Sequence, residues 1–145
     1  MIVCDTGPLV SAMNRAEGAR HRFAATLLAR LGRQVIVPWP VLTEVDLLLR
    51  ARGHPGAALT FATALRDGVH RLDAPSQDEF AVALRLGERY ADSGADLPDL
   101  MVMAMAAGRR ASILTWDFRH FRSVVLRRGH HWALVVQEHD LPSAL

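Results

Sequence analysis

The first thirteen residues, MIVCDTGPLVSAM (residues 1–13), join a short apolar segment to a turn and then to a helical pattern. The segment Ile2–Cys4 is continuously apolar, which is typical of a strand that is buried on both faces of a parallel sheet. Asp5 and Thr6 follow, and such residues are favoured at strand ends and helix N-caps. Asp5 is therefore either an ordinary turn or capping residue, or a carboxylate that the fold holds at a functional site.

The rest of the chain repeats this alternation of apolar segments and helical patterns. Further strands are expected at Val35–Val37, Val69–Leu72, Ile113–Leu114 and Ala133–Val136. Helices are expected at Gly7–Arg15, His21–Leu31, Val41–Arg52, Pro55–Asp67, Gln77–Tyr90 and Leu97–Gly108. Strands that alternate with helices predict an α/β protein with a mainly parallel sheet of four to five strands, covered on both faces. Ligands of such sheets bind beyond the carboxyl ends of the strands, where Asp5 lies.

Composition limits the possible classes of protein. The 145 residues are 50% hydrophobic and 22% charged, which predicts a single globular domain over residues 1–145. The lone cysteine, Cys4, excludes an internal disulfide and favours a reducing, cytoplasmic setting. We expect neither a signal peptide nor a membrane-spanning helix, and hence no membrane partner. All 17 basic residues are arginines, so mechanisms that require a lysine, such as a Schiff base or a P-loop, are excluded.

A second carboxylate, Glu44, lies on the apolar side of a predicted helix. It falls beside Leu48 and Ala51, whereas Asp46 is on the polar side. A charge in an apolar sector costs several kcal/mol unless it is paired or bound to a metal. Glu44 is therefore either a flanking residue that reaches solvent or an arginine, or a member of a site.

A third carboxylate, Asp99, lies inside a helical segment that is apolar on all sides from Leu97 to Gly108. It is the only charge there. Helix capping is one explanation, with Asp96 as N-cap and Asp99 as the third helical residue. A ligand role is the other.

The fourth carboxylate, Asp117, repeats the opening pattern. The apolar pair Ile113–Leu114 is followed by Thr115, Trp116 and Asp117, so a hydroxyl and a carboxylate again stand at the end of a strand. A turn explains each case singly. Two strand ends and two apolar helices that all carry acids are better explained by one shared site.

These segments, in this order, resemble the four acidic motifs of PIN-domain nucleases, and the chain length resembles VapC-type toxins of toxin–antitoxin pairs. The motifs are VCDTGPLV, VLTEV, DLPDLMVMAMA and ILTWDFRHF. The resemblance implies a three-layer α/β/α sandwich and a metal-dependent endoribonuclease. It also implies a homodimer, an RNA substrate and a cognate antitoxin as partner.

By the same resemblance, Asp5, Glu44, Asp99 and Asp117 are the acids that bind Mg²⁺ or Mn²⁺, and Thr6 and Thr115 are supporting hydroxyls. Either Asp96 or Asp99 can be the inner ligand; Asp99 is preferred because it heads the buried helix. Oxygen ligands independently favour Mg²⁺ or Mn²⁺, and no Cys/His cluster has the spacing of a zinc site. A cation held in this way activates water for phosphodiester hydrolysis.

Arginines late in the chain are candidates for phosphate contacts. Arg119 and Arg122, together with His120 between them, are nearest to the fourth motif, and Arg109 and Arg110 follow the buried helix. Two other functions remain open: a catalytically weak PIN-like module that binds protein, and a phosphoryl-transfer domain that uses Asp5 as acceptor. The second is disfavoured because Gly7 replaces the expected second Asp and there is no lysine.

Overall fold

The computed structural model describes residues 1–144 and contains a parallel sheet of four strands in the order β3-β2-β1-β4. The central strand β1 (Ile2–Cys4) pairs with β2 (Val35–Pro38) on one side and with β4 (Ser112–Leu114) on the other. The edge strand β3 (Arg71–Asp73) pairs with β2. The chain therefore places β2 and β3 on one side of β1 and β4 on the other side. This change of direction creates a topological switch point at the carboxyl end of β1, beside Asp5.

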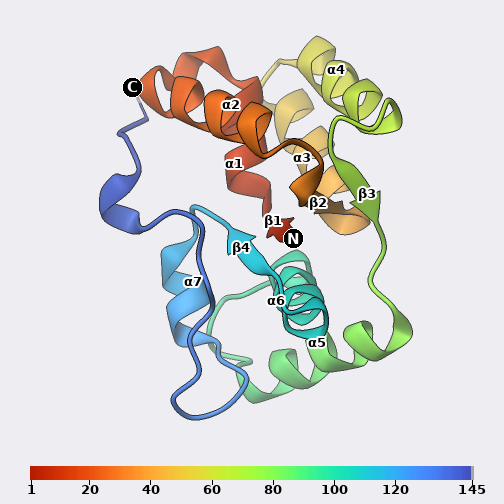
Figure 1. The fold of residues 1–145 in the computed structure, drawn as a ribbon, viewed down its shortest axis with the longest axis vertical. Helices are drawn as coiled ribbons and strands as arrows, with labels where there is room; N and C mark the ends of the chain where they lie inside the picture. Colours follow the sequence, from red (N-terminus) through yellow and green to blue (C-terminus); the bar gives the residue numbers. More distant parts are fainter. Residues whose placement is uncertain (145) are drawn as a thin grey trace.

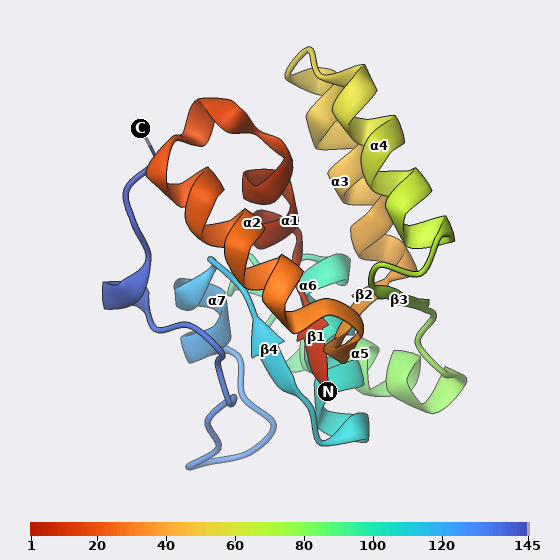
Figure 2. The same cartoon turned by 45° about the horizontal axis from the view of Figure 1, so that its top comes forward.

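Helices cover both faces of this sheet (Figures 1 and 2). One group lies on one face: α1 (Thr6–Met13), α2 (Ala19–Leu31), α3 (Trp39–Ala51) and α4 (Pro55–Arg66). The other face carries α5 (Gln77–Arg89) and α6 (Leu97–Arg109), and the short α7 (Phe118–Ser123) follows β4. Short 3₁₀ turns occur at Arg15–Glu17, Gly32–Gln34 and Glu138–Asp140. The predicted three-layer α/β/α architecture is confirmed.

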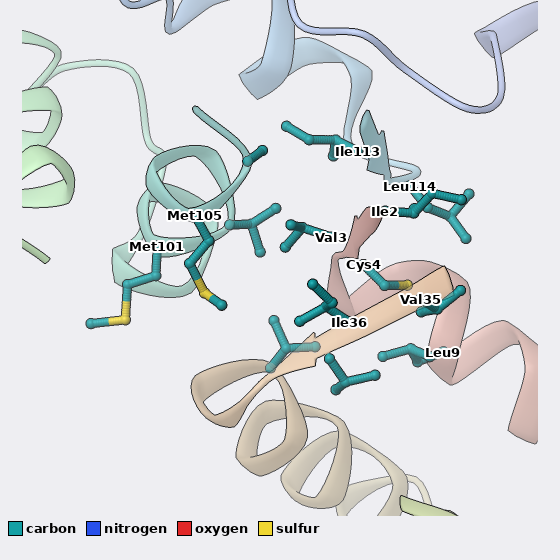
Figure 3. Packing of buried hydrophobic residues seen from close by; sticks show 14 of the residues in the cluster. Ile2, Val3, Cys4, Leu9, Val35, Ile36, Met101, Met105, Ile113 and Leu114 are labelled. Atoms are coloured by element: carbon teal, nitrogen blue, oxygen red, sulfur yellow. The ribbon is translucent and has the colours of Figure 1, made fainter. Parts of the chain in front are cut away.

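The core forms where the two helical layers meet the sheet (Figure 3). Val3 points toward α6, where Met101 and Met105 are buried, whereas Cys4 points to the side on which Leu9 of α1 lies. Both faces of β1 are therefore apolar, and this is why the strand reads as a continuous apolar run. Because Cys4 is fully buried here, it is a core residue. None of the helices within residues 1–144 is both long enough and apolar enough to cross a lipid bilayer.

Two of the predicted strands differ from the structure. The strand predicted at Val69–Leu72 lies at Arg71–Asp73 because α4 ends in a turn through Gly68, where φ is +80°, and Val69 still bonds to the carbonyl of Ala64. The segment 133–136 forms only an isolated parallel bridge, between Leu134 and Ile113.

Two features of the helices also differ from expectation. The helix α7 was not predicted, since its six residues are too few to show an apolar period. Gly108, predicted to end α6, instead lies inside the helix, and a Cβ there would come within 3.0 Å of Glu79. Gly108 therefore allows α5 to pack closely on α6, and Arg110, with φ at 52°, ends the helix.

An ion-pair cluster joins α5, α6 and β3 at the end of α6 that is remote from Asp99. Arg109 donates through Nε to Glu79 (2.9 Å) and through Nη1 to Asp73 (2.6 Å). Hydrogen bonds from the Arg109 guanidinium hold the pKa values of Asp73 and Glu79 below their ordinary range. At pH values above the ordinary pKa of a carboxyl group, Asp73 and Glu79 therefore stabilise the folded state, and this contribution is lost as the pH falls.

Arg109→Met is expected to lower the free energy of unfolding by about 2–3 kcal/mol at pH 7, because it leaves the largely buried Glu79 without its partner. Chemical denaturation across pH measures this, and the difference from wild type should shrink below about pH 4. The matched control is Arg66→Met, which removes an exposed pair with Asp67 and should cost less than about 1 kcal/mol. Equal losses in the two variants would contradict the stabilising role of the cluster.

Candidate functional site

Six carboxylates line one cleft of about 440 Å³ at the carboxyl edge of the sheet. Five of the six are acids that the sequence singled out. They come from four places in the chain: the end of β1, the middle of α3, the start of α6 and the loop before α7. They are Asp5, Glu44, Asp96, Asp99 and Asp117. The lining also includes Glu17, Arg52 and His120. Every acid that the sequence singled out thus lies in one cleft.

Asp5 directly precedes α1, but its side chain does not cap that helix within the described residues. Its Oδ2 instead accepts a hydrogen bond from the Thr115 hydroxyl, at 2.7 Å, across the junction of β1 and β4. The Asp5 amide is held as well, because it donates to the carbonyl of Leu114 at 2.9 Å. Since Asp5 is only 5% exposed, the turn-chemistry interpretation does not account for it.

Thr115 links the first acid to the fourth. Its Oγ1 donates to Asp5 and also accepts from the backbone N–H of Asp117 at 2.9 Å. Asp117 caps α7, since its Oδ1 accepts from the backbone N–H of His120 at 3.3 Å. One buried hydroxyl therefore fixes two strand ends relative to each other and orients both acids.

Asp96 and Asp99 form a reciprocal capping box at the start of α6. The Asp99 amide donates to Asp96 Oδ1 at 3.2 Å, and the Asp96 amide donates to Asp99 Oδ2 at 3.3 Å. The helix-capping explanation of these residues is therefore correct, and it does not exclude the other, because both also line the cleft. Asp99 is buried, at 9% exposure, whereas Asp96 is exposed.

Glu44 reaches the cleft from α3 and is half-buried, together with Leu48 one turn later. Thr6, the first residue of α1, is 5% exposed. No atom of residues 1–144 satisfies the geometry of a hydrogen bond to its hydroxyl oxygen. A buried hydroxyl without a partner costs free energy, so this oxygen is a position where a ligand of the cleft would be stabilised.

The acids disfavour one another's ionisation. The pKa of Asp5 is raised to about 6, mainly by burial and to a smaller extent by the charges of Glu44 and Asp117, while the hydrogen bond from Thr115 opposes the shift. Burial raises the pKa of Asp99 to about 8, and the charges of Asp5, Asp96 and Asp117 add to this effect. Burial also raises the pKa of Glu44, although the nearby Thr6 hydroxyl opposes the shift. The site is therefore suited to a bound positive charge.

The free energy of unfolding of the cation-free protein is expected to fall by about 5 kcal/mol between pH 5 and pH 8, mostly through Asp99. The folded protein holds protons on Asp5 and Asp99 in this range, whereas the unfolded chain has already released them. Denaturant unfolding in EDTA at several pH values measures the slope. The Asp99→Asn variant should lose most of this dependence of the free energy of unfolding on pH. If the dependence were unchanged in that variant, Asp99 would not be its cause.

The four arginines predicted to contact RNA lie outside the lining of this cleft. Arg109 is about 15 Å from Asp99 along the helix axis and pairs with Asp73 and Glu79. Arg122 pairs with Glu138, and Arg119 is exposed on α7. Arg110, the fourth, ends α6 on the remote side together with Arg109.

Three charged or titratable lining residues were not predicted as site members: Glu17, Arg52 and His120. Glu17 accepts a hydrogen bond from the Ser11 hydroxyl at 2.6 Å. Arg52, at the end of α3, lies eight residues after Glu44 and thus on the same side of the helix, so a signal for it existed. His120 was grouped with the neighbouring arginines as a phosphate contact. Its Nδ1 lies 3.0 Å from Asp99 Oδ2 and 2.6 Å from Asp117 Oδ2.

The tryptophans differ in exposure. Trp116 donates from Nε1 to Ser11 at 2.9 Å and packs against Gly7, where a Cβ would approach it to 3.2 Å. Trp132 donates to the carbonyl of Val124 at 2.7 Å. Trp39 is 50% exposed at the start of α3. Trp116 and Trp132 are thus held by packing and hydrogen bonds.

A larger groove, of about 730 Å³, lies between α2 and the segment around Val135 and Val136. Its lining includes one carboxylate, that of Asp140, together with Arg22 and Arg30. We place the candidate site in the smaller cleft because the five acids converge there.

No protein-family model and no curated protein sequence matches the chain. Solved structures do match it. The VapC20 toxin of Mycobacterium tuberculosis, which cleaves the sarcin–ricin loop, has a TM-score of 0.72 at 22% identity, over 86% of this chain and 97% of that one. VapBC2 from Rickettsia felis, bound to a promoter DNA fragment, has a TM-score of 0.64 at 16% identity, and the match covers 86% of this chain and 93% of that one. A toxin–antitoxin complex from Klebsiella pneumoniae has a TM-score of 0.60 at 18% identity, and the match covers 85% of this chain and 92% of that one.

These similarities extend over most of each chain, and they establish the fold. The predicted resemblance to the PIN-domain VapC toxins is therefore confirmed at the level of the fold. At such identities the chemistry has to be argued from the cleft itself.

Proposed function

We propose that the protein is a divalent-cation-dependent endoribonuclease and the toxin of a toxin–antitoxin pair. The observation that carries this proposal is the convergence of six carboxylates on one cleft at the switch point of the sheet. Burial, and to a smaller extent repulsion between neighbouring acids, raises the pKa values of Asp5 and Asp99, so their charged forms are costly in the empty cleft. Such an arrangement is stabilised when a cation neutralises it, as hydrolytic metal centres require.

The residues of the cleft fit a hard divalent cation such as Mg²⁺ or Mn²⁺. Carboxylate oxygens are the ligands that these ions prefer, and the unpartnered Thr6 hydroxyl adds a neutral oxygen. Asp5, Glu44, Asp99 and Asp117 would hold the ion, with Asp96 beside them. When bound, such a cation supplies a polarised water and stabilises charge on a phosphate.

The chain's own groups orient this chemistry. The Thr115 hydroxyl fixes the carboxylate plane of Asp5, and the capping box fixes Asp96 and Asp99 relative to each other. Asp96, the exposed member of the box, is placed to accept a hydrogen bond from an attacking water. A phosphodiester bond can be hydrolysed in this way without a nucleophilic side chain.

RNA as substrate, an antitoxin as partner and a homodimeric state are parts of the same proposal. The similarity to VapC20, a toxin that cleaves an RNA loop, and to solved toxin–antitoxin complexes supports the first two. The homodimer follows from the motif resemblance, and size-exclusion chromatography with light scattering tests it.

The direct test is incubation of the purified chain with a structured RNA and with a DNA of the same sequence, in Mn²⁺, Mg²⁺ or EDTA. We expect cleavage of the RNA with either metal and none in EDTA. Absence of RNA cleavage under all conditions would overturn the proposal and favour the protein-binding alternative. Cleavage of DNA alone would overturn the assignment of the substrate.

Arg52→Ala is expected to weaken RNA binding about 5-fold, because Arg52 is the arginine in the lining of the acidic cleft. The slope of log affinity against log salt should fall by about one. Fluorescence anisotropy in an Asp5→Asn background, where RNA stays intact, measures both. The matched control is Arg50→Ala, on the same helix but paired with Asp46, and it should change affinity by less than about 2-fold. Equal effects of the two variants would exclude a specific contact.

A further inference from the structure

The imidazole of His120 lies among the acids of the cleft, where the sequence predicted only oxygen ligands. Its Nδ1 is 3.0 Å from Asp99 Oδ2 and 2.6 Å from Asp117 Oδ2. The side chain is 19% exposed, so it is held in the cleft and does not extend into solvent. One ring atom therefore contacts two carboxylates from different elements, α6 and the loop before α7.

Local structure fixes this position. Asp117 caps α7, and the backbone N–H that it accepts from is that of His120 itself. His120 is thus the third residue of α7, and its side chain turns back toward the capping acid. On the other side of the ring, Gly94 has φ of +81°, and a Cβ on it would lie 3.4 Å from His120 Nε2. The ring therefore lies between the loop before α6 and the acids.

The spacing of the three ligand atoms suits one coordination shell. The nearest nitrogen and oxygen atoms of Asp99, Asp117 and His120 all lie within 4.8 Å of one another. Adjacent ligands of an octahedral ion, each about 2.1 Å from the metal, are separated by about 3.0 Å. The distance from Nδ1 to Asp99 matches this value, and the contact with Asp117 is shorter, at a hydrogen-bond distance. A cation bound here would take the place of the proton that Nδ1 shares with the two carboxylates.

An independent observation also indicates a ligand in this cleft. The Thr6 hydroxyl oxygen is buried and lines the same cleft, where it lies near the Glu44 carboxylate but forms no hydrogen bond of normal geometry within residues 1–144. It comes from α1, not from the segments that hold His120. A cation or its coordinated water would satisfy this oxygen.

We propose that Nδ1 of His120 is a direct ligand of the cation, alongside Asp99 and Asp117, and that it makes the centre selective for Mn²⁺ over Mg²⁺. This inference rests on the cation centre of the proposed function. Mg²⁺ takes oxygen ligands and binds imidazole poorly, whereas Mn²⁺ accepts a mixed nitrogen and oxygen set. The four acids alone give no such preference.

The test compares wild type with His120→Asn, because an amide retains a polar atom near the position of Nδ1. Calorimetric titration should show Mn²⁺ affinity reduced about 30-fold or more, while Mg²⁺ affinity changes by less than about 3-fold. Pulsed EPR of the Mn²⁺-loaded wild type should show coupling to a histidine nitrogen, confirmed by ¹⁵N-histidine labelling, and the variant should lack it. His139→Asn, which replaces a mostly exposed histidine of another segment, is the matched control and should match wild type.

The outcomes separate the two proposals. Wild type that binds neither Mn²⁺ nor Mg²⁺ would overturn the cation centre and, with it, the proposed function. Wild type that binds Mn²⁺ without nitrogen coupling would overturn the ligand assignment and leave the cation centre in place. Equal losses of Mn²⁺ and Mg²⁺ affinity in His120→Asn would likewise show that His120 only positions the two acids.

Discussion

Asp5→Asn is expected to reduce RNA cleavage by about 10³-fold or more while it leaves the fold intact. The substitution removes the charge that faces the cation, and the loss of several kcal/mol of electrostatic stabilisation corresponds to this factor. The amide oxygen of asparagine can still accept the hydrogen bond from Thr115. Initial cleavage rates of the two proteins at saturating Mn²⁺ measure the effect.

A stability measurement distinguishes lost chemistry from lost structure. In EDTA the variant should melt at the same temperature as wild type or higher, because burial already raises the pKa of Asp5 to about 6 and penalises its charge. Asp46→Asn is the matched control: it changes an exposed acid on α3 and should cleave RNA normally. If Asp5→Asn were stable and cut RNA at the wild-type rate, the proposed site would be wrong.

Mn²⁺ is expected to raise the melting temperature of the wild-type protein by about 8–10 °C at a hundred times its dissociation constant. Binding to the folded state alone adds about 2.7 kcal/mol at that concentration, and a chain of this size gains about 3–4 °C per kcal/mol. The reason lies in the cleft, where a cation relieves repulsion among Asp5, Glu44, Asp99 and Asp117. Differential scanning calorimetry at pH 7 measures the shift.

The double variant Asp5→Asn, Asp99→Asn controls for cations bound elsewhere. It keeps the exposed acids, including Asp46 and Asp67, but loses the two most buried carboxylates of the cleft. Its melting temperature should not respond to Mn²⁺. A shift as large as that of wild type would place the bound ion outside the cleft.

Much of the fold could be predicted because its signals are local. The apolar runs of β1, β2 and β4 and the glycine and proline boundaries of α4 are visible in the sequence. The edge strand β3 was misplaced because an edge strand is half-exposed and lacks an apolar run. The segment around Leu134 was predicted as a strand from its apolar composition, but only one bridge forms there.

The acids of the site could be predicted because each stands where a charge is costly or unexpected. The contacts between them could not, since they depend on which strands are neighbours. Thr115 meets Asp5 only because β4 pairs with β1. For the same reason the contact of the His120 imidazole with Asp99 could not be predicted, since the two residues are 21 positions apart and meet only in the folded chain.

Arg109 is the opposite case, because it is close to the motifs in sequence but lies outside the cleft lining. Arginines near a predicted nuclease motif favour phosphate contacts, but sequence proximity does not measure distance along a helix. Arg109 is at the far end of α6 from Asp99, where Asp73 and Glu79 hold it. Arg52 is distant in sequence from three of the four motifs, yet it lies in the lining of the cleft.

The central claim is that the acids of the cleft bind one catalytic cation between β1, α3, α6 and α7. Anomalous diffraction from a crystal soaked in Mn²⁺ tests this most directly. We expect a peak about 2.1–2.2 Å from carboxylate oxygens of Asp5, Asp99 and Asp117. A fully ordered cleft without an anomalous peak at millimolar Mn²⁺, or a peak bound only by exposed acids elsewhere, would contradict it.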